Sequence, residues 1–77
     1  MRERIIEYHI NRLKDKNPDA RLKAIEELRL LEAIEALDAL RDIYENDPND
    51  DIRQSAKQAG KEIYQKKRDG EQTNRSA

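Results

Sequence analysis

The chain has 77 residues, of which 43% are charged, and its net charge is −1. This length indicates one small domain, whose apolar core supplies no more than about 3–5 kcal/mol of net stability. The sequence contains no cysteine, which excludes disulfides, thiolate zinc sites and cysteine nucleophiles, and its balanced charge argues against a dedicated nucleic-acid-binding protein.

The composition favours helices. Eight Ile, seven Leu and eight Ala supply most of the apolar side chains, and only two Gly and two Pro are available for turns, so a β fold is excluded. No apolar run approaches the roughly 18 residues that a membrane span needs. The first residues lack the apolar centre of a signal peptide, so we expect a cytoplasmic protein.

The first predicted helix runs from about Glu3 to Lys16. Its apolar residues recur every three or four positions, which is the pattern of a helix with one buried face. They are Ile6, Ile10 and Leu13, with Ile5 and His9 beside them. Asn17 is expected to cap a second helix, in which Pro18 is the first residue because a helix leaves that backbone N–H unbonded.

Three further helical segments follow. The second helix has an apolar face of Ala24, Ile25, Leu28 and Leu31. A third run with the same period contains Ala33, Ala36, Leu37, Leu40, Ile43 and Tyr44. Asp47 ends it, because the residue before a proline avoids the α conformation. The fourth helix is expected to start near Asp50, with Ile52, Ala56, Ala59 and Ile63 on its inner face.

The apolar pattern ends after Gln65. From Arg68 onward the only apolar side chain is that of Ala77, so nothing holds this segment against a core. We therefore predict a helical domain over residues 1–67 and a frayed or disordered tail over residues 68–77.

The chain contains an internal repeat. The segments before Pro18 and Pro48 match at an offset of 30 residues, and the segments after them match at an offset of 32, so that Arg21 corresponds to Arg53. On this alignment the two extra residues lie in the loop of residues 48–51. A period of 20–50 residues is typical of stacked helix pairs. We therefore predict an all-α fold of four helices, in which two helical hairpins stack as a short α-solenoid.

Two segments, NPDARLKAIEEL and NDPNDDIRQSAKQA, resemble the second-helix signature of HEAT repeats, in particular the HEAT-like repeats of the phycobilisome-lyase type. Ile52, Arg53 and Ala56 fit that signature, whereas Ala20 replaces its aliphatic residue. The resemblance covers about residues 5–64. It implies that the second helices line the concave, ligand-facing side of the stack. It also implies that Arg21 and Arg53 bond loop acids among Asp15, Asp19, Asp47 and Asp51.

The acidic loop before the fourth helix has two interpretations. Asp47, Asn49 and Asp51 have the 1-3-5 spacing of a calcium loop, but Ile52 and Gln58 stand where that loop needs glycine and a bidentate glutamate. We favour the alternative, in which these residues cap the fourth helix and complement its N-terminal dipole. No metal site and no cofactor are predicted.

Small residues occupy the inner face of the fourth helix at Ala56, Ala59 and Gly60. A glycine inside a helix costs about 1 kcal/mol relative to alanine. Gly60 therefore predicts a close crossing with the third helix, and close approach of the backbone to a ligand is the alternative.

No catalytic set is predicted. His9 is the single histidine, and Ser55 and the three tyrosines do not combine with it into a nucleophile, a base and an orienting group. We expect His9 to be a half-buried structural residue and the protein not to be an enzyme.

Leu22 and Leu30 project away from the apolar face of the second helix. Exposed aliphatic residues indicate contact with another molecule, and packing on a neighbouring helix is the alternative. We favour packing for Leu22 and contact for Leu30. The predicted function is a small non-catalytic adaptor or scaffold that binds another protein through its second and fourth helices. The candidate contact residues are Lys23, Leu30, Lys57, Gln58 and Lys61.

Three alternatives stay open. Self-association would cover the apolar ends that two uncapped repeats expose. The resemblance implies an accessory role in phycobilisome-type pigment–protein assembly. Weak, nonspecific nucleic-acid binding would use the basic residues Lys61, Lys66, Lys67 and Arg68, which otherwise complement the dipole at a helix C-terminus.

Overall fold

The computed structural model describes the backbone of residues 1–76 and the side chains of residues 1–70. The elements are α1 (Arg2–Arg12), α2 (Pro18–Leu30), the 3₁₀ helix η1 (Ile34–Ala36), α3 (Leu37–Asn46) and α4 (Asp50–Ser76). No strand occurs in residues 1–76. The predicted all-α fold with four α-helices is confirmed.

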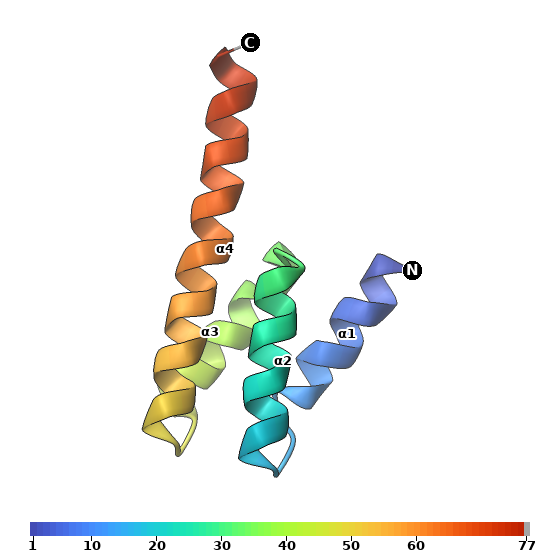
Figure 1. Ribbon diagram of the computed structural model, residues 1–77, viewed down its shortest axis with the longest axis vertical. Helices are drawn as coiled ribbons and strands as arrows, with labels where there is room; N and C mark the ends of the chain where they lie inside the picture. The colour runs from blue at the N-terminus through green and yellow to red at the C-terminus, as the bar shows by residue number, and fades with distance from the viewer. Residues whose placement is uncertain (77) are drawn as a thin grey trace.

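The helices form two stacked pairs. Figure 1 shows α2 and α4 running side by side in the same direction, with α3 behind them and α1 on the far side of α2. α4 packs against both α3 and α2, and α1 packs against α2. Because each pair has one apolar side, stacking the pairs buries both sides in a single interface.

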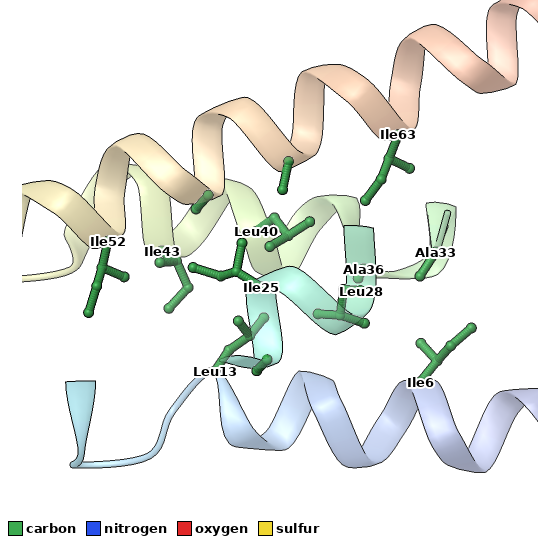
Figure 2. Close-up of a cluster of buried hydrophobic side chains, with 13 residues drawn as sticks. Ile6, Leu13, Ile25, Leu28, Ala33, Ala36, Leu40, Ile43, Ile52 and Ile63 are labelled. Atoms are coloured by element: carbon green, nitrogen blue, oxygen red, sulfur yellow. The ribbon is translucent and has the colours of Figure 1, made fainter. Parts of the chain in front are cut away.

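One hydrophobic core joins the two pairs. Figure 2 shows Ile6 of α1, Leu13 just after α1, Leu28 of α2 and Ile63 of α4 extending into the same space. Leu13, Leu28, Leu40, Ile52 and Ile63 are the largest fully buried side chains. Ala24, Ala56 and Ala59 lie in the same core. The small side chains let the helices approach each other closely, and the large ones fill the space between them.

The first helix is shorter than predicted. It ends at Arg12 rather than Lys16, because the N–H groups of Lys14 and Asp15 bond the carbonyls three residues earlier, at 3.1 and 3.0 Å. Such i−3 bonds tighten the last turn and stop the α-helix.

Both ends of α2 are capped. The Asn17 side chain accepts from the Asp19 N–H at 2.9 Å, which confirms the predicted cap. At the other end Glu32 has φ of 51°, and the Ala33 N–H bonds the Leu28 carbonyl at 3.1 Å. This is a Schellman ending with a glutamate where glycine is usual. It separates α2 from the third apolar run, so α3 begins at Leu37.

The Asp47–Pro48 pair ends α3 as predicted, because Asp47 has an extended backbone with ψ of 137°. α4 begins at Asp50 and continues to Ser76, through the segment whose composition predicts a disordered tail. Residues 64–70 are exposed, so this part of α4 lies beyond its buried face. The domain boundary at residue 67 stays a prediction, and Ala77 lies outside the described residues.

Candidate protein-interaction surfaces

A buried ion pair joins the two helix pairs. Arg21 Nε donates to Asp47 Oδ2 at 2.8 Å, and Arg21 Nη2 donates to Asp47 Oδ1 at 3.3 Å. The Asp47 side chain is 2% exposed and that of Arg21 is 11% exposed. Arg21 Nη1 also donates to the backbone carbonyls of Asp15 and Lys16, at 2.8 and 3.1 Å. Because bidentate charge-assisted bonds are strong and directional, this contact fixes how the pairs stack.

The loops that lead into α2 and α4 repeat the same hydrogen bonds. Asp15 Oδ1 accepts from the Asn17 N–H at 2.8 Å, as Asp47 Oδ1 accepts from the Asn49 N–H at 2.9 Å. Asn49 then accepts from the Asp51 N–H at 2.9 Å, which is the bond that Asn17 makes at the start of α2. The arginines follow the same pattern. Arg21 Nη1 donates to the Asp15 carbonyl, and Arg53 Nη1 donates to the Asp47 carbonyl.

These bonds correct the alignment of the repeat. All the matched loop residues are 32 positions apart, so Pro18 and Pro48 are not equivalent. The buried residues Leu13 and Ile43 are 30 positions apart. The two extra residues therefore lie between Ile43 and Asp47, in the last turn of α3. Their predicted position in the loop of residues 48–51 is wrong, because the equivalent residues are the capping Asn17 and Asn49 and not the two prolines.

The acidic loop before α4 is a helix cap. Asn49 Oδ1 accepts from the N–H groups of Asp51 and Ile52, at 2.9 and 3.3 Å. The Asp47 carboxylate is occupied by Arg21 and by the Asn49 N–H. The predicted cap of α4 is confirmed.

The contact that the HEAT resemblance implies is present for Arg21, whose partner is Asp47. Within the described residues, no third helix pair packs beside Arg53. Its Nη2 donates instead to Asp50 Oδ1 at 3.0 Å, and its Nη1 reaches the Asp47 carbonyl at 2.7 Å. The side chain of Arg53 is 33% exposed, three times as much as that of Arg21.

A shallow hollow of about 340 Å³ lies between α2 and α4. Its lining residues are Leu22, Ile25, Glu26, Arg29, Ser55, Gln58, Ala59 and Glu62. Arg29 Nη1 donates to Glu62 Oε1 at 3.3 Å across the helices, and Gln58 donates to Glu62 at 3.1 Å along α4. Of these two contacts, only the one between Arg29 and Glu62 joins the helices along one edge of the hollow.

Arg29 also binds Glu26 on its own helix. The hydrogen bond from Arg29, helped by the guanidinium charge, lowers the pKa of the Glu26 carboxyl below its ordinary value against a smaller opposing effect of burial. The same contact raises the pKa of Arg29. Both groups therefore stay charged over the physiological range.

A second groove, of about 350 Å³, lies between α3 and α4 on the side that faces away from the first helix pair. Its floor is apolar and its rim is cationic, with lining residues Leu37, Leu40, Arg41, Tyr44, Ala56, Lys57, Gly60, Lys61 and Tyr64. The Lys57 ammonium lies 5.4 Å from the centre of the Tyr44 ring. We call this site the end groove.

Gly60 does not mark a close crossing with α3, so that prediction is wrong. A Cβ atom built on Gly60 would meet nothing within 4 Å. The close contacts belong to Ala56 and Ala59, each 1% exposed, and Gly60 leaves space in the end groove. The groove was not predicted from the sequence. Its one indication there is that Gly60 stands where the first copy has the large side chain of Leu28.

The five predicted contact residues lie on different surfaces. Lys57 and Lys61 line the end groove, whereas Gln58 lines the hollow between α2 and α4. Leu30 is 62% exposed, beside a small cavity next to Arg29 and Glu62. Lys23 is exposed on α2 and lines neither site. As one binding set, the five residues stay a prediction.

Leu22 is 36% exposed, so it is only partly packed against the hollow. His9 lies inside α1, partly buried, with its ring edge-on to Tyr8 at 5.1 Å. Its Nδ1 atom is buried and has no hydrogen-bond partner in the described structure. In the basic segment of α4, Lys66 binds Glu32 at 3.1 Å.

Two general findings concern the part of the chain that the structure describes. None of its helices combines the length and the apolar character that crossing a membrane requires. Within the same residues, no three His, Cys, Asp or Glu side chains gather in a way that could hold a metal ion.

Two helical hairpins that stack in one direction, with the second helices side by side and an arginine–aspartate pair across the junction, define a short α-solenoid. A family model of HEAT repeats matches residues 2–60. The chain therefore belongs to the HEAT-repeat family. The match does not extend to the phycobilisome-lyase type, and no curated protein and no solved structure matches the chain.

Proposed function

We propose that this protein is a non-catalytic module that binds another protein on the α2/α4 face, the surface formed by Leu22, Leu30, Gln58 and the hollow between the two helices. HEAT repeats are generally protein-interaction modules. The observation that carries the proposal is Leu30, which is 62% exposed at the edge of a concave surface. A large aliphatic side chain in water gains free energy when a partner covers it.

The charges on this face suit a polar rim around an apolar contact. Arg29 binds both Glu26 and Glu62, so each charged group of this cluster has a partner and the cluster keeps a net charge of −1. Interfaces combine such a rim with a few apolar anchor residues near their centre. Leu22 and Leu30 would be those anchors.

The test is binding of a partner isolated with the full chain as bait and then purified. Leu30→Glu should weaken that binding at least about tenfold, because it places a charge in the covered contact. Ile5→Glu is the matched control, since Ile5 is an aliphatic residue on α1 that is 48% exposed. Equal binding by the two variants, with helical circular dichroism unchanged, would refute the assignment of the face.

The alternatives differ in what they predict. A role in pigment–protein assembly predicts a chromophore that co-purifies from the native host. Nonspecific nucleic-acid binding through Lys61, Lys66, Lys67 and Arg68 predicts an affinity that falls steeply with added salt. The contact between Lys66 and Glu32 already neutralises part of that cluster, which favours the protein-binding role. A cytoplasmic location stays a prediction.

A further inference from the structure

The end groove is open where its counterpart in the first helix pair is filled. At the offset of 32 residues that the loops establish, Gly60 corresponds to Leu28 and Lys57 corresponds to Ile25. Leu28 is 0% exposed and Ile25 is 3% exposed, because both pack in the core shared with the second helix pair. The second pair thus has a surface equivalent to the one on which the first pair packs against it. On this surface Gly60 leaves a space where the first pair has Leu28, and Lys57 replaces Ile25.

The junction inside the chain shows what such a surface binds. Two cations of the first pair bind acids of the second pair, Arg21 with Asp47 at 2.8 Å and Arg29 with Glu62 at 3.3 Å. Both acids belong to the pair that covers the apolar surface. An apolar contact flanked by carboxylates is therefore the chemistry by which one helix pair of this chain accepts the next.

The counterparts of these two cations are present at the open end. Arg53 corresponds to Arg21 and Lys61 corresponds to Arg29. Lys61, together with Arg41 and Lys57, lines the end groove, and no acidic side chain is among the lining residues. The groove is thus an apolar trough with a cationic rim, to which an acidic occupant is complementary.

A second copy of this chain fits the groove less well. Its exposed end would present the counterparts of Ala59 and Glu62, which are Glu27 and Leu30. Glu27 would then take the place that the buried Ala59 has in the internal junction. Leu30 would take the place of Glu62, the acid that binds Arg29 there. Burying an unpaired carboxylate is unfavourable, so the end of another molecule is a poor occupant.

We propose that the end groove binds an amphipathic helix of a partner protein, with carboxylates along its flanks and a bulky aliphatic side chain seated over Gly60. Binding of a helix in an apolar groove is a common mode of peptide recognition. Its apolar face covers Tyr44 and Tyr64, which are 38% and 52% exposed, and its carboxylates bind Lys57 and Lys61. This site is separate from the α2/α4 face.

The proposal is tested with two labelled synthetic helical peptides of about 18 residues, long enough to form several turns. They have the same leucines at i, i+3, i+4 and i+7, with glutamates on both flanks in one and lysines in the other. Fluorescence anisotropy with the full chain should show binding of the glutamate peptide, with at least about tenfold weaker binding of the lysine peptide. Lys57→Glu combined with Lys61→Glu should reverse that preference.

Filling the groove is the second arm. Gly60→Leu should weaken binding of the glutamate peptide about 10- to 100-fold, because the new side chain takes the place of the peptide's leucine. Gly70→Leu is the matched control, since it makes the same change in the same helix and a Cβ there also meets nothing within 4 Å. The control should bind the peptide as the unchanged protein does, and both variants should keep their helical content.

Several results would overturn the proposal: no binding of the glutamate peptide, equal binding of the two peptides, or equal binding by Gly60→Leu and Gly70→Leu. A dimer in sedimentation that Gly60→Leu dissociates would also overturn it, because a second copy would then be the occupant. The result for Leu30→Glu bears only on the α2/α4 face, so the two proposals can fail separately.

Discussion

Replacing Asp47 with alanine should remove most of the stability of this small domain. The change leaves the Arg21 guanidinium 11% exposed and without its carboxylate. Breaking a buried ion pair in this way costs about 3–5 kcal/mol, and the lower end applies because Arg21 keeps two backbone carbonyl partners. Losing the acceptor for the Asn49 N–H adds about 0.5–1 kcal/mol. A domain of this size has about 3–5 kcal/mol in total, so Asp47→Ala should be largely unfolded at 25 °C.

The matched control is Asp15→Ala, which changes the same residue in the same loop of the first copy. Asp15 accepts the equivalent bond from the Asn17 N–H, but it is exposed and no arginine binds its carboxylate in the described structure. Its loss should cost only about 0.5–1 kcal/mol. Urea denaturation followed by circular dichroism at 222 nm measures both variants. Equal destabilisation by the two substitutions would refute the reasoning, because only one of them breaks a contact between the helix pairs.

Three further predictions concern single positions. Gly60→Ala should raise the free energy of unfolding by about 0.8–1 kcal/mol in a thermal melt, because a Cβ there meets no neighbour; destabilisation would instead indicate a close crossing with α3. Glu32→Gly should stabilise by about 0.5–1 kcal/mol in urea, because φ of 51° strains a residue with a side chain; a loss of stability would show that the Lys66 contact matters more than the strain. In an NMR titration Glu26 should show a pKa below its ordinary value, and Arg29→Met should raise that pKa back. A lowered pKa contributes stability above the ordinary pKa of glutamate and loses it as the pH falls through the lowered value. An unchanged Glu26 titration in Arg29→Met would contradict the assigned cause.

The elements that local chemistry controls were predictable from the sequence. The Asn17 cap, the stop at Asp47–Pro48 and the start of α4 near Asp50 depend on residues next to one another in the chain. The buried faces followed from the spacing of the apolar residues, because residues three or four positions apart lie on the same side of a helix. The duplicated hairpin and the HEAT signature gave the stacking order.

The features that depend on distant residues were not predictable to the same degree. Asp15 and Asp47 have equivalent places in the sequence, and only the stack decides that Asp47 receives Arg21 while Asp15 stays exposed. The sequence does not reveal the role of Gly60, because a small residue in a helix fits a tight contact and an open groove equally well. The left-handed backbone at Glu32 was missed because glycine, its usual sequence signal, is absent.

The functional surfaces show the same division. Exposure of Leu30 follows from its angle on the helix, so the sequence indicated it correctly. Lys57 and Gln58 are neighbours in the sequence but line different sites, because consecutive helix residues point about 100° apart. Their grouping into one contact set required knowledge of which side of α4 faces α2.

The stacking of the two helix pairs through Arg21 and Asp47 is tested most directly by a double-mutant cycle. The free energy of unfolding would be measured for the unchanged protein, Arg21→Met, Asp47→Asn and the double variant, chosen so that the asparagine still accepts the loop hydrogen bond. We expect a coupling energy of about 1.5–3 kcal/mol, as for two residues in one buried network. A coupling energy near zero would show that the two side chains do not meet, and would contradict the stacked arrangement.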